Sequence, residues 1–70
     1  MLKEELQAVM ILNKDRQEDL AAALGKNLGT ISDKINGRTA FKADEIEAIA
    51  LRYKLNAEDI QRIFFPKTVN

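Results

Sequence analysis

The side chains best suited to chemistry are the cations and amides gathered in the middle of the chain. The segment from residue 26 to residue 42 has a surplus of three positive charges, although the 70-residue chain has a net charge of zero. Lysine and arginine contact phosphate oxygens, and amide and hydroxyl side chains bind phosphates and base edges. The segment therefore favours an anionic partner. Its charged residues are Lys26, Asp33, Lys34, Arg38 and Lys42.

The chain also carries adjacent carboxylates, which could act together as a general acid and base. They stand near the expected helix starts, where the helix dipole favours negative charge, and no segment forms an obvious pocket around them. The chain has no Cys and no His, which excludes thiol and imidazole catalysis and the common zinc sites. We therefore expect a binding domain and not an enzyme, with no cofactor and no metal. The pairs are Glu4–Glu5, Glu18–Asp19, Asp44–Glu45 and Glu58–Asp59.

Apolar residues recur at spacings of three and four, which predicts amphipathic helices, and no segment alternates as a strand would. Five helices are expected, over about residues 2–12, 16–24, 28–36, 43–53 and 57–65. We thus predict an all-α fold with one domain over residues 1–66 and a short C-terminal tail over residues 67–70. The core is expected to contain Ile31, Ile35, Phe41, Ile46, Ile49, Tyr53, Ile60 and Ile63.

Capping residues set the expected helix starts. Asp15 followed by Glu18 has the form of a capping box for the second helix. Asn27 is a good N-cap for the third helix, and Asn56 with Asp59 for the fifth. These positions fix where the chain turns between helices.

The segment from Gln17 to Gly37 reads as two short helices joined by a sharp turn. Gly25 makes the turn, because glycine adopts left-handed backbone angles without a Cβ penalty, and the small Ala21 lets the helices cross closely. This is the helix-turn-helix pattern, whose second helix enters the major groove in DNA-binding proteins. The core between the two helices is expected to be Leu20, Leu24, Ile31 and Ile35.

Five short segments carry a likeness to a known family: Gln17-Glu18-Asp19-Leu20-Ala21, Leu24-Gly25, Thr30-Ile31-Ser32, Lys34-Ile35-Asn36-Gly37, and Phe41 with Glu45-Ile46. Together they resemble the Cro/CI family of phage and bacterial repressors, and most closely its small phage-borne members. The resemblance covers about residues 2–66. It implies a compact five-helix, lambda-repressor-like DNA-binding domain with a central helix-turn-helix. It also implies a phage- or prophage-type transcriptional regulator that binds double-stranded operator DNA.

The resemblance implies which side chains meet DNA. Gln17 would approach a phosphate, and Asn36, at the end of the recognition helix, would contact the DNA backbone. The family places base-facing side chains at positions 28, 29, 30 and 33. Leu28 can only touch a thymine methyl and Asp33 can only accept from cytosine, so few base contacts are expected. Asn27 is expected first as a cap. The full expected set is Gln17, Asn27, Leu28, Gly29, Thr30, Asp33, Lys34, Asn36, Arg38 and Lys42.

A function of another class fits the same face. Some small phage modulators that resemble this family bind a repressor protein and block its DNA binding. In such an antirepressor the contacts would be Leu28, Asp33 and Phe65. An acid among apolar groups can pair with basic residues of a repressor, whereas it would repel phosphate. A third alternative is a small helical domain that has lost DNA binding.

The C-terminal aromatic residues leave two alternatives open. Phe64, Phe65 and Val69 exceed what a five-helix core plainly needs. Either Phe64 closes the core and the tail is frayed, or these side chains contact a second copy in a homodimer. A two-fold dimer would bind a palindromic site with half-sites about 34–36 Å apart.

The chain contains no apolar run of the roughly 20 residues that span a bilayer. Its start, Met1-Leu2-Lys3-Glu4-Glu5, is acidic and helical, unlike a signal peptide. We expect no membrane partner and a cytoplasmic location in a bacterial host cell.

Overall fold

The helices expected from the apolar spacing all form. The computed structural model describes residues 1–66, which contain five helices and no strand, so the all-α prediction is confirmed. The expected tail over residues 67–70 lies outside the described residues. None of the helices within residues 1–66 is long and apolar enough to cross a bilayer. The helices are α1 (Lys3–Leu12), α2 (Gln17–Leu24), α3 (Leu28–Ile35), α4 (Ala43–Tyr53) and α5 (Ala57–Phe64).

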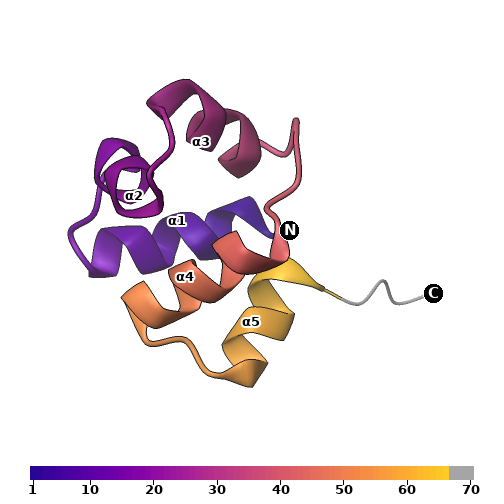
Figure 1. Ribbon diagram of the computed structural model, residues 1–70. Helices are drawn as coiled ribbons and strands as arrows, with labels where there is room; N and C mark the ends of the chain where they lie inside the picture. Colours follow the sequence, from indigo (N-terminus) through magenta and orange to yellow (C-terminus); the bar gives the residue numbers. More distant parts are fainter. Residues whose placement is uncertain (67–70) are drawn as a thin grey trace.

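The five helices pack around one apolar core. In Figure 1, α1 crosses the middle of the molecule, with α2 and α3 on one side and α4 and α5 on the other. The radius of gyration is 11.5 Å, close to the roughly 11 Å of a globular chain of this length. Phe41, Ile46 and Ile60, expected in the core, are only partly buried against it. The fully buried side chains are Leu6, Leu20, Ile31, Ile35, Ile49 and Ile63.

Left-handed residues close four of the helices. Gly25 (φ 66°) follows α2 and Gly37 (φ 83°) follows α3, as expected for residues without a Cβ. Lys14 (φ 55°) and Lys54 (φ 57°) hold the same conformation after α1 and α4, where a lysine is strained. The connections after α1, α2 and α4 are short, whereas residues 36–42 link α3 to α4.

The predicted caps are confirmed at α3 and α5 but wrong at α2. Asn56 and Asp59 exchange hydrogen bonds of 2.8 and 3.1 Å between side chain and backbone. At α2, the residue before the helix is Arg16, and its N–H donates to the carboxylate of Asp19 at 2.8 Å. The helix starts one residue later than expected, so the Asp15–Glu18 capping box does not form.

Asp15 instead joins the end of α1 to α4. Its carboxylate accepts hydrogen bonds from the Arg52 guanidinium at 2.7 and 2.9 Å and from the Tyr53 hydroxyl at 2.6 Å. The hydrogen bond from Arg52 lowers the pKa of Asp15, in spite of partial burial, and the bond from Tyr53 lowers it further. This contact holds the C-terminal end of α4 against the loop that connects α1 to α2.

The start and the end of the described chain meet. The Leu2 N–H donates to the Ile63 carbonyl at 2.7 Å, which anchors the start of α1 on α5. Phe64 is buried and packs edge-on against Phe41, with ring centroids 5.9 Å apart, so it closes the core. Phe65 is 54% exposed, and Val69 lies outside the described residues.

Candidate nucleic-acid interface

The pair α2–α3 presents the first turn of α3 to solvent. Ala21 is buried where the two helices pack, together with Leu20 and Ile31. The Asn27 side chain accepts a hydrogen bond of 2.7 Å from the Thr30 N–H, which confirms Asn27 as the N-cap of α3. This bond satisfies one of the four N–H groups that have no partner within the helix at its start.

The apolar and small residues at the start of α3 are exposed. Leu28 is 47% exposed. Gly29 beside it is also exposed, and the Thr30 side chain is half-buried. Leu28 and Gly29 therefore form an exposed surface without charged side chains at the first turn of α3, which another molecule can contact.

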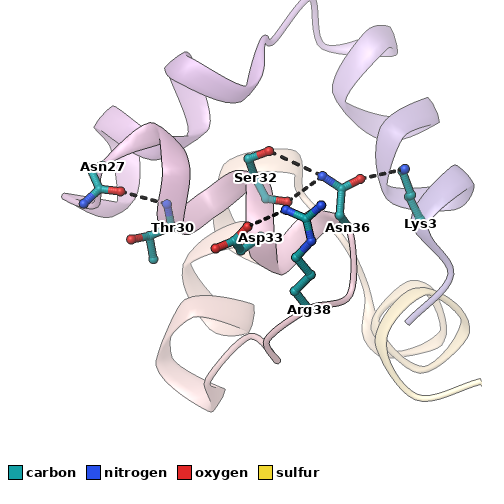
Figure 2. A network of polar contacts seen from close by, with 7 residues as sticks. All are labelled: Lys3, Asn27, Thr30, Ser32, Asp33, Asn36 and Arg38. Atoms are coloured by element: carbon teal, nitrogen blue, oxygen red, sulfur yellow. Dashed lines mark hydrogen bonds and ion pairs between the residues drawn. The ribbon is translucent and has the colours of Figure 1, made fainter.

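A chain of polar contacts covers the C-terminal end of α3 (Figure 2). The Asn36 amide donates to the Ser32 carbonyl at 2.9 Å and lies 3.4 Å from the Ser32 hydroxyl. Its side-chain oxygen accepts a hydrogen bond of 2.7 Å from the ammonium of Lys3. Lys3 comes from the first turn of α1, and it is not among the expected residues, because no local sequence pattern relates residues 33 positions apart.

The acid on α3 is paired. Asp33 accepts a hydrogen bond from the Arg38 guanidinium at 3.0 Å, across the turn that follows α3 (Figure 2). The Arg38 side chain is 74% exposed, so its remaining donors face solvent. Because this ion pair is exposed, it contributes little to stability, but it offsets the negative charge that Asp33 adds to this face.

Lys34 does not lie on the surface where it was expected. Its side chain is 8% exposed and its ammonium contacts both carboxylate oxygens of Glu45, at 2.5 and 2.7 Å. Lys34 shares the inward face of α3 with Ile31 and Ile35, three positions before it and one after it. That spacing is the signal that could have identified it as buried. The expectation that Lys34 is a free surface cation is wrong, because the buried carboxylate neutralises it.

Glu45 links α3 to the start of α4. Its side chain is 4% exposed, and besides Lys34 it binds the Lys42 N–H at 2.7 Å. Burial raises the pKa of Glu45, but the hydrogen bonds from Lys34 and from the Lys42 N–H outweigh it and hold the pKa below its usual value. Glu45 is thus ionised at neutral pH, and its contact with Lys34 holds α3 against α4.

Two cations of the expected DNA-binding segment, one before α3 and one before α4, form no ion pair within residues 1–66. Lys26 precedes α3 and Lys42 precedes α4, and both are exposed and take part in none of the ion pairs found within residues 1–66. Gln17 is the first residue of α2, and its half-buried side chain has no hydrogen-bond partner in that part of the chain. Along the chain, Lys26 and Arg38 are thus the exposed cations nearest to the two ends of α3.

The residues expected to contact a protein do not all lie together. Leu28 and Asp33 are both on α3, whereas Phe65 follows α5 and lines a pocket with Lys34 and Gly37 at the C-terminal end of α3. Phe65 also lines an apolar groove between α4 and α5 together with Ala43, Ile46, Glu47, Ala50, Leu51, Leu55 and Ile60. Phe65 therefore lies near the end of α3 that is opposite to Leu28, and it borders the α4–α5 groove as well.

No three acidic side chains in residues 1–66 gather so that they could hold a metal ion. Comparisons with known proteins add no assignment: no protein-family model matches the chain, and no curated protein or solved structure gives a significant match.

Proposed function

We propose that this domain binds duplex DNA through α3 as a phage- or prophage-type transcriptional regulator in the bacterial cytoplasm. The observation that carries the proposal is the exposed first turn of α3, packed on α2, together with the exposed cations that precede and follow α3 in the chain, Lys26 before it and Arg38 and Lys42 after it. In a helix-turn-helix, the same relation puts the second helix in the major groove and its flanks on phosphates. No catalytic activity is part of this role.

Binding of this kind draws most of its free energy from phosphates. Lys26, Arg38 and Lys42 supply the charge, and the free side chain of Gln17 supplies a neutral donor at the start of α2. Each phosphate that a cation neutralises steepens the dependence of affinity on salt.

Base readout is limited to a few groups. Thr30 can donate to or accept from a base edge, and Leu28 can touch a thymine methyl. Because Asp33 is paired with Arg38, it is less repulsive to DNA than its charge alone implies. The specificity therefore rests on few base contacts together with sequence-dependent DNA shape.

The test is a salt titration of binding to fluorescently labelled duplexes from the gene's own neighbourhood, followed by fluorescence anisotropy. Wild-type protein binds saturably and more tightly as salt falls. Lys26→Ala lowers the slope of log K against log salt by about one, equally for all duplexes.

The matched control is Lys54→Asn, at the turn between α4 and α5, which lies far from α3 in Figure 1. Asparagine tolerates the left-handed backbone of Lys54, so the variant removes a charge without new strain. The control keeps the wild-type slope. No binding at low salt, with the helical spectrum intact, contradicts the proposal.

A second candidate function is an antirepressor that binds a repressor protein. The observation that favours it is the outward face of α3, where Leu28 is 47% exposed and Asp33 is the one charged group, since Lys34 is buried. Leu28→Ala separates the two functions, because it removes an apolar anchor but no phosphate contact. The antirepressor function is supported if the wild-type protein binds a repressor encoded nearby but not DNA, and if Leu28→Ala loses the binding to that repressor.

A further inference from the structure

Lys3 carries a positive charge that no carboxylate offsets. The ammonium donates to the Asn36 side-chain oxygen, and Lys3 takes part in none of the ion pairs within residues 1–66. An ammonium has three donors and no acceptor, so this single bond leaves two donors for another ligand. An amide oxygen orients the charge without cancelling it.

The position of Lys3 is fixed by the fold. Leu2, the residue before it, is bonded through its N–H to Ile63, and α1 starts at Lys3 itself. The Asn36 amide is in turn bonded to the Ser32 carbonyl on the last turns of α3. The backbone next to Lys3 is thus anchored on α5, and its ammonium is bound to Asn36 at the C-terminal end of α3, where the helix dipole favours a cation.

Arg38 lies at the same end of α3 (Figure 2). In that view, Lys3 reaches Asn36 from α1, while Arg38 reaches Asp33 from the turn after α3. Asp33 offsets the charge of Arg38, and Lys3 is in no ion pair within residues 1–66, so this end of the helix keeps the positive charge of Lys3. All the side chains involved are at or near the surface.

We propose that Lys3 and Arg38 form a phosphodiester-binding site at the C-terminal end of α3, with Asn36 as the residue that positions Lys3. This inference rests on the proposed DNA binding and identifies where a second stretch of DNA backbone is held. Lys26 contacts phosphate at the start of α3 and Lys3 does so at its end. Asn36 then affects DNA binding by orienting Lys3, because the side-chain oxygen of Asn36 already accepts the hydrogen bond from the lysine.

The experiment compares Lys3→Ala with wild type in the same anisotropy titration. Loss of one phosphate contact lowers the salt slope by about one and weakens binding about eightfold at 0.1 M salt. Lys3→Arg keeps the slope, and the control Lys54→Asn behaves as wild type. Thermal unfolding of Lys3→Ala stays close to wild type, because the bond to Asn36 is exposed.

A double-mutant cycle tests the role of Asn36. If Asn36 acts through Lys3, Asn36→Ala weakens binding in the wild-type background and has no effect when Lys3 is already alanine. Additive effects contradict the positioning role and mean that Asn36 contacts DNA directly.

The outcomes for the two proposals are separable. An unchanged slope for Lys3→Ala, with Lys26→Ala still weakening binding, overturns the Lys3 site and leaves DNA binding standing. Absence of DNA binding by wild-type protein overturns both.

Discussion

Removing one partner of the Lys34–Glu45 ion pair is expected to destabilise the domain far more than removing any other charge near α3. The Lys34 side chain is 8% exposed and the Glu45 side chain 4%, with N–O distances of 2.5 and 2.7 Å. Lys34→Met leaves the carboxylate of Glu45 buried without its cation. Breaking a buried pair in this way costs about 3–5 kcal/mol.

We expect the lower end of that range, about 3 kcal/mol, because the pair lies near the surface of a small domain. A chain of 70 residues has a total stability of about 4–10 kcal/mol, so the variant loses a large share of it. Glu45→Met leaves the Lys34 ammonium buried and also removes the acceptor for the Lys42 N–H. It therefore costs about 1 kcal/mol more.

The double variant Lys34→Met with Glu45→Met recovers most of the lost free energy of unfolding, because two apolar side chains of similar volume can replace a buried ion pair. About 1 kcal/mol stays lost, from the missing bond at the start of α4. The assay is urea denaturation followed by far-UV circular dichroism, which gives the coupling free energy of the pair.

The controls are Lys42→Met and Glu47→Met, two exposed charges nearby, each expected to change stability by less than about 0.5 kcal/mol. The reasoning is refuted if either single variant of the pair loses less than about 1 kcal/mol. It is also refuted if the double variant loses the sum of the two single losses, because the pair would then have no coupling.

Three further predictions follow from the backbone and from the titrating groups. Gly29→Ala stabilises the protein by about 0.5–1 kcal/mol, measured by urea denaturation, since a Cβ there meets only the Asn27 side chain at 3.6 Å. The same variant weakens DNA binding, measured by anisotropy, because the added methyl group crowds the first turn of α3. Lys54→Gly raises the free energy of unfolding by about 1 kcal/mol, because glycine relieves the left-handed strain; an unchanged or lower value contradicts this. The pKa of Asp15 is lower when folded, so the stability it contributes is complete above its ordinary pKa of 3.8 and is lost as pH falls through the folded value. The melting temperature of Asp15→Asn therefore falls less steeply at acid pH than that of the wild type. The same pH dependence of melting temperature in both proteins would contradict this role of Asp15.

The sequence predicts helices well because spacing and caps are local. Asn27, Gly25 and the Asn56–Asp59 pair act within one turn of their own residues, and each lies where it was expected. Apolar periodicity likewise identified the buried faces of α3 and α4, including Ile31 and Ile49.

The errors share one physical cause, which is that a charged side chain takes its role from a distant partner. Lys34 was assigned to the surface by its charge, but Glu45 on the next helix makes its burial favourable. Asp15 was assigned to a cap, but Arg52 binds it from 37 residues away. Lys3 had no assignment at all, because Asn36 approaches it only in the folded chain.

The central claim is that α3 is the surface that binds DNA, and an NMR titration of isotope-labelled protein with a short duplex at low salt tests it most directly. If α3 binds DNA, the backbone amide shifts change from Lys26 to Arg38 and around Lys3, while the amide shifts along the groove between α4 and α5 stay unchanged. Absence of shifts at saturating DNA, or shifts confined to that groove, would contradict it.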